Sequence, residues 1–206
     1  RDGYPDWLLL RRGDVFNDIL STNWKKSGRS ESEKMVVGAY GEGPRPVLQT
    51  GTSKALSLFK RDRRAHVAFV SLELRPGVRY QNDGMKLVSP GVEDFLFEDL
   101  LISGYTHGIV LQGDTTGDMQ DIEVRRCILI DNAGQTHSQG IFAHFVDGVL
   151  IEGCVIDRNG WDPARGRDDS ATIFAHNVYI QRTVTGLVFR DNFFSRASSH
   201  GIQARL

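Results

Sequence analysis

The sequence is poor in several features that would narrow its function at once. Only two cysteines occur among 206 residues, without a CxxC motif or metal-ligand spacing, so cysteine usage leaves the compartment open. Lysine and arginine number 25 against 26 aspartates and glutamates, which leaves no global basic field to attract nucleic acid. No run of about 18 apolar residues exists, so no membrane-spanning helix is predicted. A hydrophobic content of 40% still permits one sizeable core.

A helical period is also missing, and a repeat of strand-like segments stands in its place. Four segments align without a gap over their central stretch; the first three begin 27 residues apart and the fourth begins 38 further on. They are FLFEDLLIS (95–103), IEVRRCILI (122–130), VLIEGCVID (149–157) and LVFRDNFFS (187–195). A fifth copy, VAFVSLEL, lies upstream at 67–74. Their apolar alternation predicts strands with one buried face, and a period in the twenties is typical of stacked units.

The aligned columns agree with a stack of parallel strands. One outward column alternates in charge, so neighbouring coils place each carboxylate beside a cation. Its members are Glu98, Arg125, Glu152 and Arg190. The next column predicts a bend and contains Asp99, Arg126, Gly153 and Asp191. Cys127 and Cys154 share a column with Leu100, which predicts buried stack members, although neighbouring coils are close enough for a disulfide.

Each unit continues with a second, shorter strand. These strands are GMKLV (84–88), GIVLQ (108–112), GIFAH (140–144), NVYIQ (177–181) and GIQAR (201–205). The first residue is glycine four times and asparagine once, as a position with positive φ would select. The alternation then predicts which residues point into the core and which point outward.

Short strands, glycine-rich bends and coils of about 27 residues describe a parallel β-helix. Together with LLLRRGDVF (8–16) and VVGAYGEGPRPVL (36–48), the repeat resembles bacterial right-handed parallel β-helix proteins of the pectate-lyase-like superfamily. The resemblance spans nearly the whole chain and implies an all-β, right-handed solenoid. The superfamily contains lyases, hydrolases, epimerases and binding proteins, so the fold alone does not select an activity.

The predicted organisation is a single domain over residues 1–206. Residues 1–34 form an irregular N-terminal part, with an exposed serine-rich loop at 21–34, and residues 35–206 form the stacked coils. The chain begins at Arg1 and stops directly after a second strand, and solenoid edges are normally capped, so we expect a partial chain from which further coils are missing. The resemblance implies an extracellular or periplasmic bacterial protein, although no signal peptide is visible.

The outward face of the second strands is where a function is expected, because substrate grooves in this superfamily commonly run along one outer sheet. Polar side chains gather on the last three units, over roughly 10 Å. They are His144, His176, Asn177, Tyr179, His200 and Arg205. Histidine can act as a base, tyrosine can donate a proton, and arginine binds carboxylates bidentately. β-Elimination or C5 epimerisation of a uronate needs these groups.

We therefore expect the partner to be an acidic, uronate-containing polysaccharide or oligosaccharide. His176 or His200 is the predicted base, Tyr179 the proton donor, and Arg205 with Asn177 the carboxylate ligand. The further substrate-binding candidates are His144, Gln181, Trp161, Arg165 and Arg167. FAHNVYI (174–180) and SSHGIQAR (198–205) resemble stretches of uncharacterised β-helix proteins linked to polysaccharide degradation.

An insertion supplies some of these candidates. The third unit is 11 residues longer than the others, within WDPARGRDDSAT (161–172), and insertions in solenoids often lie on the binding face. Its adjacent Asp168 and Asp169 are a weak signal for Ca²⁺, and no other cofactor is predicted.

Three other interpretations stay open. A histidine before a bend can simply cap the turn, as we expect for His107, and Lys86 can be a solvated cation. A non-catalytic carbohydrate-binding or spike-like, adhesin-like solenoid needs no acid or base. A glycoside hydrolase needs two carboxylates across the scissile bond, and the second strands supply only Asp83 unless Asp168 or Asp169 reaches in.

Overall fold

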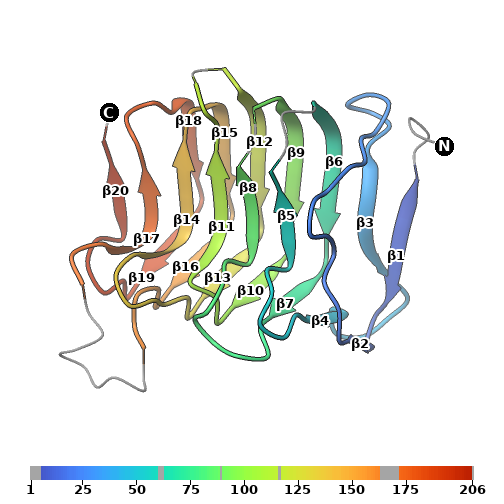
Figure 1. Cartoon of the computed structure of the whole chain (residues 1–206), viewed down its shortest axis with the longest axis horizontal. Coiled ribbons are helices and arrows are strands. Elements are labelled where there is room, and N and C mark those ends of the chain that lie inside the picture. Colours follow the sequence, from blue (N-terminus) through green and yellow to red (C-terminus); the bar gives the residue numbers. More distant parts are fainter. Residues whose placement is uncertain (1–5, 60–62, 89, 116, 163–171, 206) are drawn as a thin grey trace.

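A computed structural model describes residues 6–59, 63–88, 90–115, 117–162 and 172–205. Three parallel sheets wind around one core (Figure 1), and the described segments contain no helix. Sheet A comprises β1 (Trp7–Arg11), β3 (Met35–Tyr40), β6 (Arg64–Val70), β9 (Val92–Glu98), β12 (Met119–Arg125), β15 (Val146–Glu152) and β18 (Thr185–Arg190). Sheet B comprises β2 (Val15–Phe16), β4 (Val47–Gln49), β7 (Glu73–Arg75), β10 (Leu101–Ser103), β13 (Ile128–Ile130), β16 (Val155–Asp157) and β19 (Phe193–Ser195). Sheet C comprises β5 (Leu56–Leu58), β8 (Met85–Val88), β11 (His107–Gln112), β14 (Ser138–His144), β17 (Ala175–Ile180) and β20 (Ile202–Ala204).

The register of the strands reproduces the predicted columns. Ile122 pairs with Phe95 on one side and with Val149 on the other, as the 27-residue period requires. The bend column is equally regular, because all four members have a positive φ of 52 to 64°. These members are Asp99, Arg126, Gly153 and Asp191. The all-β parallel solenoid is therefore confirmed.

Stacked side chains fill the core and line the outward charge column. Phe69 and Phe97 are fully buried and stack with ring centroids 5.8 Å apart. On the outside, the Glu152 carboxylate forms ion pairs with the guanidinium groups of Arg125 at 2.8 Å and Arg190 at 2.9 Å. The column of alternating charge is therefore a ladder of ion pairs.

The two cysteines are members of the inward stack. Cys127 and Cys154 are both buried and both free thiols, which confirms the interpretation without a bridge. Burial raises the pKa of the Cys127 thiol well above its ordinary value. Both residues therefore pack as small hydrophobic groups.

The glycines that lead the second strands have a different role from the predicted one. Gly84, Gly108 and Gly140 do not have positive φ, so that expectation was wrong. A Cβ atom on any of them would lie 2.6 Å from a backbone oxygen of the next coil. Glycine is needed here because neighbouring coils approach each other too closely for a side chain.

An interior ladder of asparagines supports the turns that lead from sheet B to sheet C. Asn132, Asn159 and Asn177 are all fully buried. Asn132 donates to the Asn159 side-chain oxygen at 2.9 Å, and Asn159 donates to that of Asn177 at 2.8 Å. Asn177 in turn donates to the Ser195 carbonyl at 2.7 Å. Buried amides are thus satisfied from coil to coil.

Residues 6–34 are more ordered than predicted. β1 pairs with β3 and β2 pairs with β4, so this segment supplies the first strands of sheets A and B. Trp24, within the stretch expected to be an exposed loop, is buried and lies edge-on to Phe69 at 5.3 Å. This apolar contact fastens the polar segment to the core.

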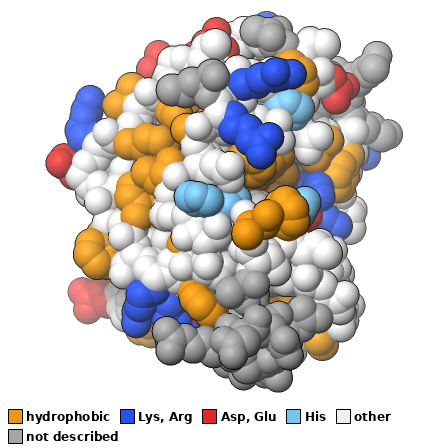
Figure 2. Space-filling model, turned by 90° about the vertical axis from the view of Figure 1, so that its left-hand side faces the viewer, with side chains coloured by type: hydrophobic (Ala, Val, Ile, Leu, Met, Phe, Trp, Pro, Cys, Tyr) orange, Lys and Arg blue, Asp and Glu red, His pale blue; other side chains and the backbone are white. Residues whose placement is uncertain are grey.

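The last described coil forms an end face of the solenoid (Figure 2). Val188, Phe193 and Ile202, from the last strand of each sheet, are exposed. Hydrophobic, basic and histidine side chains lie close together on this face (Figure 2). Among the described residues, no helix has the length and apolar character needed to cross a membrane.

Candidate functional site

A groove of about 620 Å³ runs over the outer face of sheet C. Its residues come from successive coils because equivalent positions stack in register. One row contains His107, Gln139 and His176, and the next contains Lys86, Val110, Phe142, Tyr179 and Gln203. We call this surface the sheet C groove. The outward columns predicted from the repeat therefore form one continuous surface.

The middle of the groove is aromatic and amide-rich. Phe142 and Tyr179 lie 5.8 Å apart between ring centroids, and the Arg205 guanidinium lies 5.7 Å above the Tyr179 ring. Glutamine side chains surround these rings at positions 112, 139, 181 and 203. Such a combination offers apolar faces and directional hydrogen bonds to a ligand.

His176 lies below the groove surface. It is 2% exposed, and its Nδ1 accepts the His200 backbone N–H at 3.4 Å. Burial, aided by His200, His137 and Arg205, lowers the pKa of His176 to about 4. The ring is therefore neutral at pH 7, with Nδ1 occupied as an acceptor and the proton on Nε2. In this state His176 donates a hydrogen bond rather than accepting a proton.

His200 has a more open environment. Its side chain is exposed, and its Nδ1 lies 3.0 Å from the Ser199 hydroxyl. The ring also faces His176, at 5.3 Å between centroids. The structure thus gathers His176, His200, Tyr179 and Arg205 in one groove, together with Gln181, while their catalytic and binding roles stay predictions.

Asn177 is not available to a ligand. Its side chain is fully buried in the asparagine ladder, where Asn159 and the Ser195 carbonyl occupy it. This corrects the expectation that Asn177 engages a substrate carboxylate. The residue shapes the site from within, because it holds the turn next to His176.

The other predicted binding residues lie beside the groove or outside the described ranges. The His144 ring contacts Phe142 and Phe145 and does not belong to the described lining; burial lowers its pKa. Trp161 is also absent from that lining, since its indole N–H donates to the Arg196 carbonyl at 2.8 Å. Four candidates fall outside the described residues, namely Arg165, Arg167, Asp168 and Asp169.

Asp83, Lys86 and His107 form a cluster at the other end of the groove, and the sequence did not predict that these three side chains contact one another. His107 Nδ1 lies 2.6 Å from one oxygen of Asp83, and Lys86 donates to the other at 2.8 Å. Asp83 is buried, which alone would raise its pKa, yet the hydrogen bonds and charges of His107 and Lys86 lower it to about 2. His107, which was expected to cap a turn, and Lys86, which was expected to be a solvated cation, therefore both contact the Asp83 carboxylate. The available signal was that Asp83 and His107 are consecutive members of one column.

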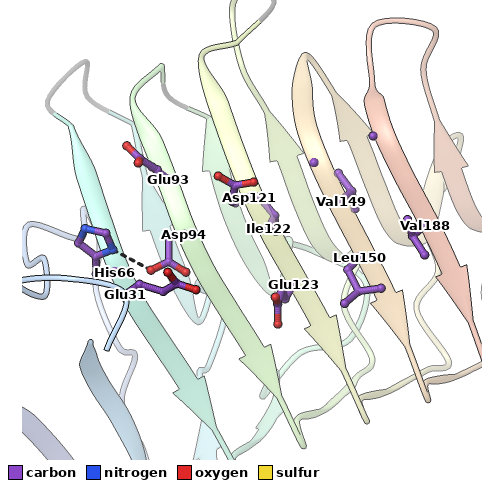
Figure 3. Close-up of a pocket in the computed structure, with 12 residues that line it drawn as sticks. Glu31, His66, Glu93, Asp94, Asp121, Ile122, Glu123, Val149, Leu150 and Val188 are labelled. Atoms are coloured by element: carbon purple, nitrogen blue, oxygen red, sulfur yellow. Dashed lines mark hydrogen bonds and ion pairs between the residues drawn. The ribbon is translucent and has the colours of Figure 1, made fainter. Parts of the chain in front are cut away.

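A second groove, of about 450 Å³, lies on the outer face of sheet A (Figure 3). Its lining includes five carboxylates from a loop and two neighbouring strands, so we call it the acidic groove. These are Glu31, Glu93, Asp94, Asp121 and Glu123. Asp94 contacts Lys34 and lies 2.7 Å from His66 Nδ1.

The acidic groove follows a line of backbone irregularities. One residue per coil has positive φ here, including Asp94 at 53° and Asp121 at 51°, and these residues drop out of the ladder register. Such bulges turn a side chain away from the regular alternation. The aligned repeat segments begin one residue after each bulge, so this column was not predicted from the sequence.

No group of three or more histidine, cysteine, aspartate or glutamate side chains within the described ranges is arranged to hold a metal ion. The described lining of the sheet C groove contains imidazole, phenol, ammonium, guanidinium and amide groups. Comparison with protein-family models, curated proteins and solved structures finds no match to this chain.

Proposed function

We propose that the sheet C groove binds an acidic polysaccharide and that an imidazole in it removes the proton next to a uronate carboxylate, giving β-elimination or C5 epimerisation. The observation that carries this proposal is the character of the lining. Lys86 and Arg205 join several histidines and an aromatic floor, and no carboxylate belongs to the described lining. An anionic sugar is attracted to such a surface, and its ring can stack on the floor.

Arg205 and Tyr179 are the proposed contacts for the uronate unit. The guanidinium above the Tyr179 ring has a planar donor set that matches a carboxylate. Such a contact withdraws charge from the carboxylate and so favours loss of the neighbouring proton. The role of Tyr179 as a proton donor remains a prediction.

The test uses a panel of uronate polymers and two readouts. Elimination is followed by the ultraviolet absorbance of the unsaturated product, and proton abstraction without cleavage by deuterium uptake at C5 in D₂O. Arg205→Ala should lower kcat/KM at least tenfold, since charge-assisted hydrogen bonds contribute about 1.5–3 kcal/mol. Arg182→Ala, which changes an exposed arginine outside the described lining, is the matched control. Absence of both signals with every polymer would overturn the proposal.

Glycoside hydrolysis is the second candidate, because the acidic groove supplies carboxylates from neighbouring coils. New reducing ends without an unsaturated product, lost in Asp121→Asn, would assign hydrolysis to that groove. Saturable binding without any product would instead assign a carbohydrate-binding module.

A further inference from the structure

Four histidines line the sheet C groove, and three of them are poorly arranged to act as a base. His176 has its acceptor nitrogen occupied by the His200 backbone. His200 and His137 are exposed, and the His137 ring contacts the Phe174 ring, with 4.7 Å between the centroids. An imidazole without a fixed tautomer presents its lone pair only part of the time.

His107 has the arrangement that the others lack. The Asp83 carboxylate, 2.6 Å from Nδ1, requires the proton to reside on that nitrogen. Nε2 then carries the lone pair, and no described residue forms a hydrogen bond with it. The side chain is 20% exposed and borders the groove. The orientation and the tautomer are therefore both fixed before a ligand arrives.

Lys86 also holds the Asp83 carboxylate in place. It donates to the second Asp83 oxygen at 2.8 Å, so the carboxylate is held from two directions. Asp83 is 6% exposed, which keeps water from competing for these contacts. A negative charge fixed behind the ring stabilises the imidazolium that forms when Nε2 accepts a proton.

We propose that His107 is the general base of the sheet C groove and that Asp83 is its positioning residue. The inference rests on the proposed function and replaces His176 and His200 as the source of the base. The substrate class is a polyuronate whose C5–H bond points to the β11 side of the groove.

The chemistry balances without another reactant. Nε2 of His107 takes the C5 proton, and the C5–H electron pair forms the C4–C5 double bond as the bond from C4 to the glycosidic oxygen breaks. The departing oxygen takes up the proton that the imidazolium now holds, which restores the neutral ring. Delivery of a different proton to C5 from the opposite face, by a second donor, would give epimerisation instead; the imidazolium then loses its proton to water and the second donor regains one from water.

The matched control already exists in the chain. His66 lies 2.7 Å from Asp94, which also contacts a lysine, but this cluster lies in the acidic groove. His107→Gln should lower kcat by at least about 100-fold, the usual contribution of a positioned base, whereas His66→Gln should stay within about twofold of the wild type. Circular dichroism melting verifies that both variants are folded.

Asp83→Asn separates positioning from structure. It should lower kcat with little change in KM and shift the acidic limb of the pH profile to lower pH, because loss of the anion favours the neutral ring. Besides Lys86, the other described titratable or charged groups that line the groove lie on later coils: Tyr179, Arg205 and the other three histidines. A structural defect would lower activity equally at every pH.

The outcomes distinguish the two proposals. Wild-type activity that survives His107→Gln but is lost in His200→Gln would overturn the inference and leave the proposed function standing. A wild type that neither eliminates nor exchanges C5 hydrogen on any polymer would overturn both. Independently of activity, ¹⁵N NMR should find the His107 proton on Nδ1, and a proton on Nε2 would contradict the assignment.

Discussion

Among the described residues, one cluster of lysine, aspartate and histidine lies on the outer face of sheet C and another on the outer face of sheet A. His107 lies 2.6 Å from Asp83 in the sheet C groove, and His66 lies 2.7 Å from Asp94 in the acidic groove. The contacts are nearly the same, but four further carboxylates surround the second cluster, while none belongs to the described lining of the first groove. The two clusters therefore differ in the surrounding charge rather than in the local contact, and under the proposed function only the cluster in the sheet C groove would meet an anionic substrate.

The clusters also differ in what the fold requires of them. Asp94 and His66 sit at bulges with positive φ, and Lys34 reaches Asp94 from the polar segment that precedes β3. This cluster therefore fastens a loop to sheet A. Lys86 lies in β8 and Asp83 just before it, and the contact between Asp83 and His107 joins neighbouring coils. His107 also borders a groove whose described lining contains no carboxylate, whereas His66 lies in the acidic groove, and this difference agrees with the proposed role of His107.

The largest expected effect on binding comes from introducing a carboxylate into the sheet C groove, so that it resembles the acidic groove. Gln203 pairs with Tyr179 across β17 and β20, so Gln203→Glu brings a carboxylate into the groove near Arg205. We expect affinity for a uronate oligosaccharide to fall at least tenfold, or about 1.4 kcal/mol, measured by titration calorimetry. Glu123→Gln in the acidic groove serves as the control. Equal affinities for wild type and Gln203→Glu would contradict the assignment of the groove.

An intermediate effect separates anchoring from catalysis. Asp94→Asn weakens the contacts to Lys34 and His66, so the free energy of unfolding should fall by about 1 kcal/mol, or about 2–4 °C in melting temperature. Activity at a temperature where the variant is folded should be unchanged. Loss of activity without loss of stability would show that the acidic groove takes part in the reaction.

The smallest expected effect concerns pH. Burial first, then neighbouring cations, lower the pKa of His176 from 6.5 to about 4 in the folded protein, so the unfolded chain binds the extra proton first. Stability should therefore fall as pH drops from 6.5 toward 4, by less than about 1 kcal/mol over the first unit. His176→Phe should flatten this slope in calorimetric melts. An unchanged slope would mean that His176 is readily protonated in the folded state.

Asp83 should act in a separate window. Its pKa is lowered from 3.8 to about 2, so its contribution to stability is complete above pH 3.8 and is lost as pH falls toward 2. The contributions of His176 and of Asp83 to stability can thus be distinguished by the pH at which each is lost.

The repeat of strand-like segments was sufficient to predict the solenoid fold and the residues that share a column. Equivalent positions of successive coils stack, so aligning the second strands makes Phe142 and Tyr179 neighbours even though the insertion lies between them. The reason for the glycines at 84, 108 and 140 could not be deduced, since close approach between coils depends on their spacing in three dimensions. Asn177 was misassigned because alternation breaks at the start of β17, which turns its amide into the core. Asp94 was missed because the aligned segments begin one residue after it, and because its positive φ breaks the alternation expected of a strand.

The central claim is that an acidic sugar binds over sheet C and not over sheet A. Backbone amide chemical shifts measured during titration with a uronate oligosaccharide test it most directly. The account predicts saturable shifts at residues of β11, β14 and β17, including His107 and Tyr179, with those of Glu93 and Asp121 unmoved. Saturable shifts confined to the acidic groove would contradict it.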